Sequence, residues 1–148
     1  DDAAMKYRAD SIEFMLPGLP EQVKAITGVS GVEEWGRWSD ANLAPAVDID
    51  YVDPLPKSFD LVLRARAYGH NVGEPISVRV GDEERFVSLG EQDSTVTLRF
   101  DNPRGAQKIS ITPPAPTEPK ESASGGFTPK KLGIGLVSLK VEAASPSS

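Results

Sequence analysis

Apolar and polar residues alternate with a period of two along most of the chain, and this pattern predicts β-strands. The longest such segment, 59–67, has one apolar face and one mostly charged face: Phe59, Leu61, Leu63, Ala65 and Ala67 against Asp60, Val62, Arg64 and Arg66. One face is therefore expected in a core and the other in solvent. Further strands are predicted at 48–52, 76–80, 85–89, 95–100, 108–112 and 131–141, the last with a switch of face near Val137.

Turn-forming residues separate these segments. The 13 prolines and 13 glycines are spread along the chain rather than gathered in one linker. Residues 81–84 are predicted to form a hairpin turn, because Gly81 can adopt a positive φ. Short strands, frequent turns and almost no helical periodicity indicate an all-β fold, an antiparallel β-sandwich or jelly roll resembling carbohydrate-binding modules.

Residues 19–26 fit two structures. Pro20 can begin a helix and Gly28 can end one. The favoured alternative is a strand at 23–27 that pairs with the closing strand, 131–141. Residues 11–15 are expected to add an edge strand.

A single domain is predicted over residues 1–142, with a disordered tail at 143–148. It contains a long loop at 113–129, rich in Pro, Ser, Thr, Glu and Gly, whose composition cannot bury enough apolar surface to order itself. A mobile surface loop is favoured over a lid above a site.

Charge and composition exclude several classes of protein. The net charge of −6 opposes nucleic-acid binding, which requires a basic face. The absence of cysteine excludes disulfides and thiolate chemistry, and fits a bacterial cytosol or a periplasm equally well. No apolar segment approaches the roughly 20 residues of a membrane span, and the first residues do not form a signal peptide. We expect a soluble monomer without direct membrane insertion.

Both tryptophans lie within one short segment, which is the main candidate site. Trp35 and Trp38 flank Arg37, and Asp40 follows. Indoles stack on sugar rings, while guanidinium and carboxylate groups hydrogen-bond to hydroxyls or anionic substituents. The alternative is that one or both indoles, Trp38 before Trp35, fill the end of a core and that Arg37 caps a turn.

A second group of candidate ligand-binding residues follows the strand 59–67. Tyr68, His70 and Asn71 are expected in one end loop that meets the loop of Trp35 and Asp40, where they would add stacking and hydrogen bonds. The favoured alternative is a simple turn, since Gly69 and Asn71 tolerate positive φ and an exposed histidine needs no role.

Catalysis and cofactors find little support in the sequence. His70 is the only histidine, so a two-histidine metal site is impossible. No nucleophile elbow, phosphate-binding loop or dinucleotide fingerprint is present, and Gly133 and Gly135 are interpreted as sites of close packing or a bulge. No cofactor or metal is predicted. A structural calcium ion is an alternative, with oxygen ligands from Asp82, Glu83, Glu84, Asp101 and Asn102, but their spacing matches no known calcium loop.

Six segments carry a family resemblance in their order along the chain: EWGRWSD (34–40), PLPKSFDLV (54–62), AYGHN (67–71), PISVRVG (75–81), FDNP (100–103) and KLGIG (131–135). Over residues 31–141 the chain resembles the C-terminal, non-catalytic region of the bacterial phosphoglycerol transferase I family. That family belongs to the alkaline-phosphatase superfamily, lies in the inner membrane and transfers phosphoglycerol from phosphatidylglycerol to periplasmic glucans. The resemblance implies a periplasmic accessory module, and it carries over no catalytic residue.

Two functions therefore remain open. The domain binds a glucan or related oligosaccharide and raises its concentration near the catalytic domain upstream in the same polypeptide. Alternatively, it is a structural module that orients that catalytic domain and binds no ligand of its own.

Overall fold

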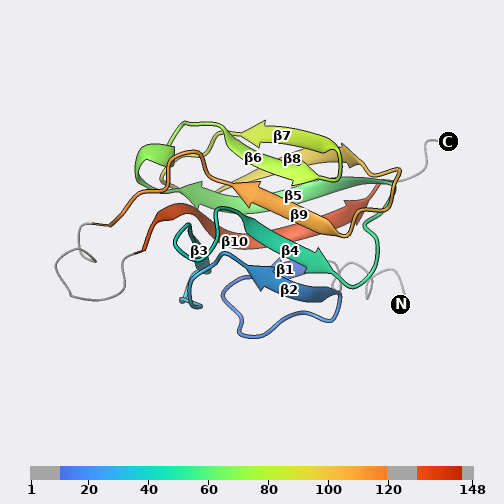
Figure 1. Cartoon of the computed structure of the whole chain (residues 1–148), viewed down its shortest axis with the longest axis horizontal. Helices are drawn as coiled ribbons and strands as arrows, with labels where there is room; N and C mark the ends of the chain where they lie inside the picture. Colours follow the sequence, from blue (N-terminus) through green and yellow to red (C-terminus); the bar gives the residue numbers. More distant parts are fainter. Residues whose placement is uncertain (1–10, 120–129, 145–148) are drawn as a thin grey trace.

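Two antiparallel β-sheets packed face to face make up the protein, as the alternation predicted. The computed structural model describes residues 11–119 and 130–144, and the strands of one sheet overlie those of the other in Figure 1. The first sheet contains β1 (Ser11–Glu13), β3 (Arg37–Asp40), β5 (Ser58–Ala67), β8 (Ser94–Asp101) and β10 (Leu132–Ala143). The second sheet has the order β2 (Val23–Thr27), β4 (Val47–Tyr51), β9 (Lys108–Thr112), β6 (Ile76–Val80) and β7 (Glu83–Val87). One 3₁₀ turn, η1 (Gly69–Asn71), follows β5.

The alternation in β5 predicts its burial correctly. Its inward side chains, from Phe59 to Ala67, are at most 3% exposed and lie in the core between the sheets. Phe59 stacks on Phe100 of β8 with ring centroids 5.8 Å apart. Val96 and Leu98 of β8 also pack on the core but are only partly buried, because β8 is an edge strand. This core fixes β5 and makes its other face the outside of the first sheet.

The predicted switch of face in the closing strand is confirmed. Leu136 and Leu139 are both buried, and the register of β10 against β5 shifts between Leu136 and Ser138. A bulge at Val137 therefore lets both halves of a long strand bury their apolar residues. The other edge of β10 pairs with β3 along its first half and with β1 along its second half.

The N-terminal strands are confirmed in part. β2 covers the predicted residues, but the predicted pairing with the closing strand is wrong: β2 pairs with β4, and Ile26 lies opposite Ile49. The edge of β10 that it would need is occupied by β1 and β3. The edge strand β1 ends at Glu13, two residues earlier than expected.

The turn between β6 and β7 is shorter than predicted. It contains only Gly81 and Asp82, and Gly81 has a φ of 58°. A two-residue turn of this kind favours glycine at its first position. Glu83 and Glu84 consequently belong to β7, where Glu84 pairs with Arg79 of β6.

Residues 113–119, the described part of the predicted loop, are tied to the domain. Thr117 exchanges backbone hydrogen bonds with Leu132, and the amide of Ala115 donates to the side chain of Asn71. The prediction for residues 120–129 lies outside the described residues, as does that for 145–148. Ala143, the first residue of the predicted tail, closes β10, and the amide of Ala144 donates to Ser58 O.

Candidate functional site

Three aromatic side chains gather on the outer face of the first sheet, where β3, β10 and β5 run side by side. Trp38 of β3 lies opposite Gly135 of β10, which lies opposite Arg66 of β5. The Trp38 ring makes edge-to-face contacts with Trp35 at 4.8 Å and with Tyr68 at 5.3 Å between centroids. Such contacts between rings are favourable beyond the area that they bury. Neither indole belongs to the core between the sheets, so the core-packing alternative does not hold.

Gly135 makes room for both indoles. A Cβ atom at this position would lie 2.8 Å from Cζ3 of Trp38 and 3.1 Å from Cη2 of Trp35. Any side chain there would displace the rings, which rest against the backbone of β10. The interpretation of this glycine as a site of close packing is confirmed.

Arg66 completes the cluster and was missed as a site residue. Its Cζ lies 3.8 Å from the centroid of Trp35 and 5.4 Å from that of Trp38, which is cation–π geometry. Nη1 lies 3.6 Å from Asp93 Oδ1, while Nε is buried and donates no hydrogen bond to any described residue. The available signal was its place on the charged face of β5, two residues before Tyr68.

A shallow pocket of about 470 Å³ lies beside this cluster. Its lining combines ring surface with polar groups and comes from Trp38, Arg66, Ala67, Tyr68, Gly69 and Glu91. A guanidinium can donate to hydroxyl groups and a carboxylate can accept from them. Trp35 does not line the pocket but packs against Arg66 and Trp38, which do. Glu91, in the connection between β7 and β8, was also missed, because no periodicity marks it.

Arg37 and Asp40 serve the fold rather than the pocket. Arg37 Nε donates to Ser30 O at 2.7 Å, and burial lowers the pKa of this guanidinium from its ordinary value. Asp40 is only 5% exposed, and its Oδ1 accepts from the backbone amides of Asn42 and Lys131, both at 3.0 Å. The segment was expected to be a loop, yet residues 37–40 form β3, which these bonds hold against its neighbours.

The candidate residues that follow β5, Tyr68, His70 and Asn71, lie in different surroundings. Residues 69–71 form a turn, as the favoured alternative expected, while the Tyr68 ring contacts Trp38, as the ligand-binding alternative expected. Asn71, by contrast, is fully buried. The Asn71 amide donates to Tyr68 O and Ala115 O, each at 2.8 Å, so it positions two backbone segments and is not available to a ligand. His70 is exposed on the turn η1, where its backbone amide donates to Thr117 Oγ1.

Comparison with known proteins places the chain in a family. Residues 1–143 match the family described as "Domain of unknown function (DUF7024)". The chain belongs to the DUF7024 family. It is 50% identical over 140 residues to phosphoglycerol transferase I of Escherichia coli O139:H28 (strain E24377A / ETEC) and of Shigella boydii serotype 18 (strain CDC 3083-94 / BS512). These matches cover 95% of the chain but 18% of each relative, so the DUF7024 domain corresponds to a small part of the transferase.

Solved carbohydrate-binding modules share the DUF7024 fold. A mutant of the family 29 module CBM29-2 aligns with a TM-score of 0.56 and 12% identity, covering 90% of this chain and 84% of the module. A second mutant, complexed with cellulohexaose, aligns with a TM-score of 0.55 and 13% identity over 90% of this chain and 91% of the module. At these identities the likeness establishes the fold only.

The acidic residues considered for calcium do not form a metal site in the described residues. Asp82, Glu83 and Asp101 line one depression, but Glu83 Oε1 accepts from the amide of Asp101 and from Arg85. Asn102 is buried, and its side chain bonds to backbone groups of Leu55 and Ala106. Over residues 11–119 and 130–144, no three His, Cys, Asp or Glu side chains are grouped to hold an ion.

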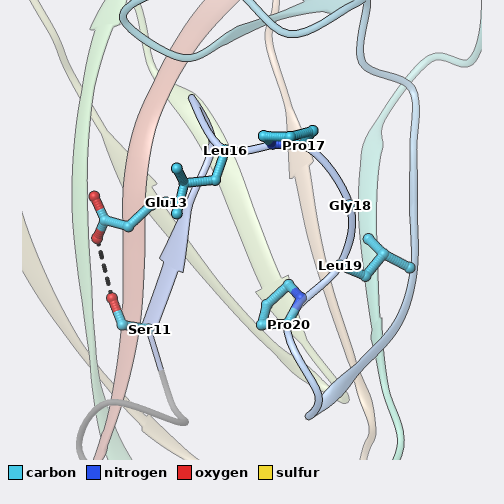
Figure 2. A pocket seen from close by; sticks show the side chains of 7 residues that line it. All are labelled: Ser11, Glu13, Leu16, Pro17, Gly18, Leu19 and Pro20. Atoms are coloured by element: carbon cyan, nitrogen blue, oxygen red, sulfur yellow. Dashed lines mark hydrogen bonds between the residues drawn. The ribbon is translucent and has the colours of Figure 1, made fainter.

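A second hollow of the DUF7024 domain has a different character. Figure 2 shows the loop after β1 curving around it, with Leu16, Pro17, Leu19 and Pro20 beside Ser11 and Glu13. Met15, Leu16 and Leu19 are 47%, 57% and 48% exposed. This lining offers aliphatic surface but no aromatic ring on which a sugar can stack. In the described part of the chain, no helix has the length and apolar character to cross a membrane.

Proposed function

We propose that this DUF7024 domain is a non-catalytic accessory module that binds a glucan or related oligosaccharide for a phosphoglycerol transferase. The observation that carries the proposal is the pocket in which Trp38 and Tyr68 stand beside Arg66 and Glu91. The transferase relatives and the fold shared with carbohydrate-binding modules support it.

The pocket offers the two kinds of contact that sugars need. The apolar face of a pyranose packs on the ring surface of Trp38 or Tyr68, while its hydroxyls accept from Arg66 and donate to Glu91. Trp35 acts indirectly, because it holds the Arg66 guanidinium from one side. Arg37, Asp40 and Asn71, whose hydrogen bonds go to the backbone, are not part of this proposed site.

The proposed setting is the periplasm, as part of an inner-membrane protein. There the module tethers the acceptor glycan near the catalytic domain of the same polypeptide, which raises the effective concentration of the acceptor without further contacts. The module is expected to act as a monomer, without nucleic acid and without inserting into the membrane.

The experiment is a titration of the intrinsic tryptophan fluorescence with millimolar neutral gluco-oligosaccharides of several linkages. Tyr68→Ala removes one wall of the pocket and leaves both tryptophan reporters in place. We expect a saturable shift that Tyr68→Ala abolishes. The matched control, Phe86→Ala, removes an aromatic side chain that is 59% exposed on the second sheet and should leave the shift intact. A folded wild-type domain that shows no shift with any linkage would contradict the proposal.

The second candidate function is a structural module that orients the transferase domain. The exposed aliphatic side chains Met15, Leu16 and Leu19 favour it, since contiguous apolar surface marks contact sites between domains. In a full-length transferase, Leu16→Ser combined with Leu19→Ser would then lower activity without changing glycan binding. Unchanged activity in this double variant would argue against the second candidate.

A further inference from the structure

The charges at the pocket are unevenly paired. Among the described residues, two charged side chains line it, Arg66 and Glu91. Arg66 lies 3.6 Å from Asp93 and is stacked on Trp35, so its charge is already partly compensated. No described Lys, Arg or His approaches the Glu91 carboxylate to ion-pair distance, and Glu91 is exposed. Of the two charged side chains that line the pocket, the acid Glu91 is therefore the one without an ion-pair partner among the described residues.

Arg64 lies outside the pocket and shares the acidic partner of Arg66. Its Nη2 lies 3.9 Å from the same Asp93 carboxylate, it does not line the pocket, and its side chain is 55% exposed. Arg64 and Arg66 thus share one carboxylate, Asp93, and with Glu91 the two arginines and two carboxylates of this region sum to zero, on a chain whose net charge is −6. Within the described residues, the cation that an anionic ligand would meet in the pocket, Arg66, already has an acidic partner.

Resting on the glycan-binding function proposed above, we infer that the pocket accepts a neutral sugar residue and disfavours one that carries a phosphodiester. A neutral pyranose uses Arg66 as donor and Glu91 as acceptor and leaves the Arg66–Asp93 pair in place. A phosphodiester in the pocket would compete with Asp93 for Arg66 and would be repelled by Glu91.

Such a preference fits a module that serves a phosphoglycerol transferase. Transfer of phosphoglycerol turns a neutral acceptor residue into an anionic product residue. A pocket that retains the former and releases the latter keeps unmodified stretches of glycan near the catalytic domain. The class of ligand is thus the acceptor of the reaction and not its product.

The test compares one neutral gluco-oligosaccharide that binds the wild-type domain with the same oligosaccharide after it has been esterified with phosphoglycerol. Binding is measured by isothermal titration calorimetry at low and at high salt. We expect the esterified ligand to bind about threefold to tenfold more weakly at low salt, which is the effect of two like unit charges about 4 Å apart in a water-like medium, because Glu91 is exposed. Added salt should shrink the difference, because exposed charges are screened.

Two substitutions assign the effect to Glu91. Glu91→Gln keeps the size and an accepting oxygen but removes the charge. It should weaken binding of the neutral ligand, because Glu91 accepts from the sugar, and it should narrow the difference between the neutral and the esterified ligand to within about twofold. As a control, Asp82→Asn removes one charge from the exposed turn between β6 and β7, and it should change the binding of neither the neutral nor the esterified ligand. Circular dichroism and thermal unfolding establish that each variant is folded.

The outcomes separate this inference from the function on which it rests. If no neutral ligand binds, the glycan-binding function itself fails. If the neutral ligand binds and the esterified one binds equally or more tightly, the function stands and the inference is overturned. A difference that persists at high salt and in Glu91→Gln would also overturn it, because exclusion would then be steric.

Discussion

The outer faces of the two sheets use polar residues in different ways. On the second sheet, neighbouring strands carry complementary side chains: Ser110 donates to Asp48 at 2.6 Å, Lys108 lies 3.9 Å from Asp50, and Ser77 and Arg79 both bond to Glu84. On the first sheet, Asp60 and Arg99 form a similar pair at one end of β5. At the other end of β5, rings stack around the Arg66 guanidinium, and its acidic partner, Asp93, lies in the connection between β7 and β8 and not on a neighbouring strand.

The difference supports the aromatic end of the first sheet as the candidate binding surface. Cross-strand pairs in solvent satisfy one another and add little to stability. The aromatic end of the first sheet instead contains a glycine inside a strand and a buried Arg66 Nε that has no hydrogen-bond partner among the described residues, and both features are unfavourable. A surface that keeps such unfavourable features in order to hold aromatic rings in place is more typical of a binding site than of an ordinary solvent-exposed face.

The largest expected effect comes from adding a side chain beneath the rings. Gly135→Val should lower the free energy of unfolding by about 3 kcal/mol, the upper part of the range for overpacked sites, and should abolish glycan binding. The measurement is urea unfolding followed by the fluorescence titration. Gly90→Val is the matched control, since a Cβ there meets nothing within 4 Å, and it should be nearly neutral. Equal losses in both variants would show that the rings do not depend on Gly135.

A smaller effect is expected at Trp35, and it tests whether this side chain positions Arg66 or contacts the ligand itself. Trp35→Ala removes the surface on which Arg66 stacks and should cost about 1–2 kcal/mol of stability, the sum of a cation–π and a ring contact. Binding should weaken although Trp35 does not line the pocket. Trp35→Phe keeps an aromatic face, so it should retain most of the stability and most of the glycan binding, as measured by urea unfolding and calorimetry. Full binding in Trp35→Ala would contradict the positioning role.

Local patterns predicted the strands well, since burial on one face leaves a period of two in the sequence. β5, β6, β9 and β2 lie where the pattern placed them, to within one residue. β3 was missed because long-range contacts hold it: Ser39 Oγ accepts from the amides of Gly133 and Ile134, more than 90 residues away. The wrong partner for β2 has a similar origin, because alternation does not specify which strand lies next to it.

The site was harder to predict than the fold. Trp38 and Tyr68 were proposed because their residue types favour stacking, and the two rings do meet, while their binding of a ligand stays a prediction. Asp40 and Asn71 carry the same polar groups as a ligand site, but here those groups bind backbone amides and carbonyls. Residue type alone cannot distinguish these two uses. Arg66 and Glu91 enter the pocket only because the sheet brings β3, β5 and the β7–β8 connection together.

The smallest effect is expected where the first sheet resembles the second, at the Asp60–Arg99 pair. A hydrogen bond from Arg99 at 2.7 Å lowers the pKa of the Asp60 carboxyl below its ordinary value. A carboxyl whose pKa is lower in the folded state stabilises the protein at pH values above the pKa that the group has in the unfolded chain, about 3.9. This contribution is lost as the pH falls through the lower, folded pKa. Thermal unfolding of wild type and Asp60→Asn should therefore differ slightly at neutral pH and converge in strong acid.

The same substitution tests whether the two ends of β5 are independent. Asp60→Asn should leave glycan binding unchanged at every pH where the protein is folded, because neither Asp60 nor Arg99 lines the pocket. Added salt should also remove most of the small stability difference, since this pair is exposed to solvent. A loss of binding in Asp60→Asn would instead mean that the charged end of the face contacts the ligand, and the site would then extend along the whole of β5.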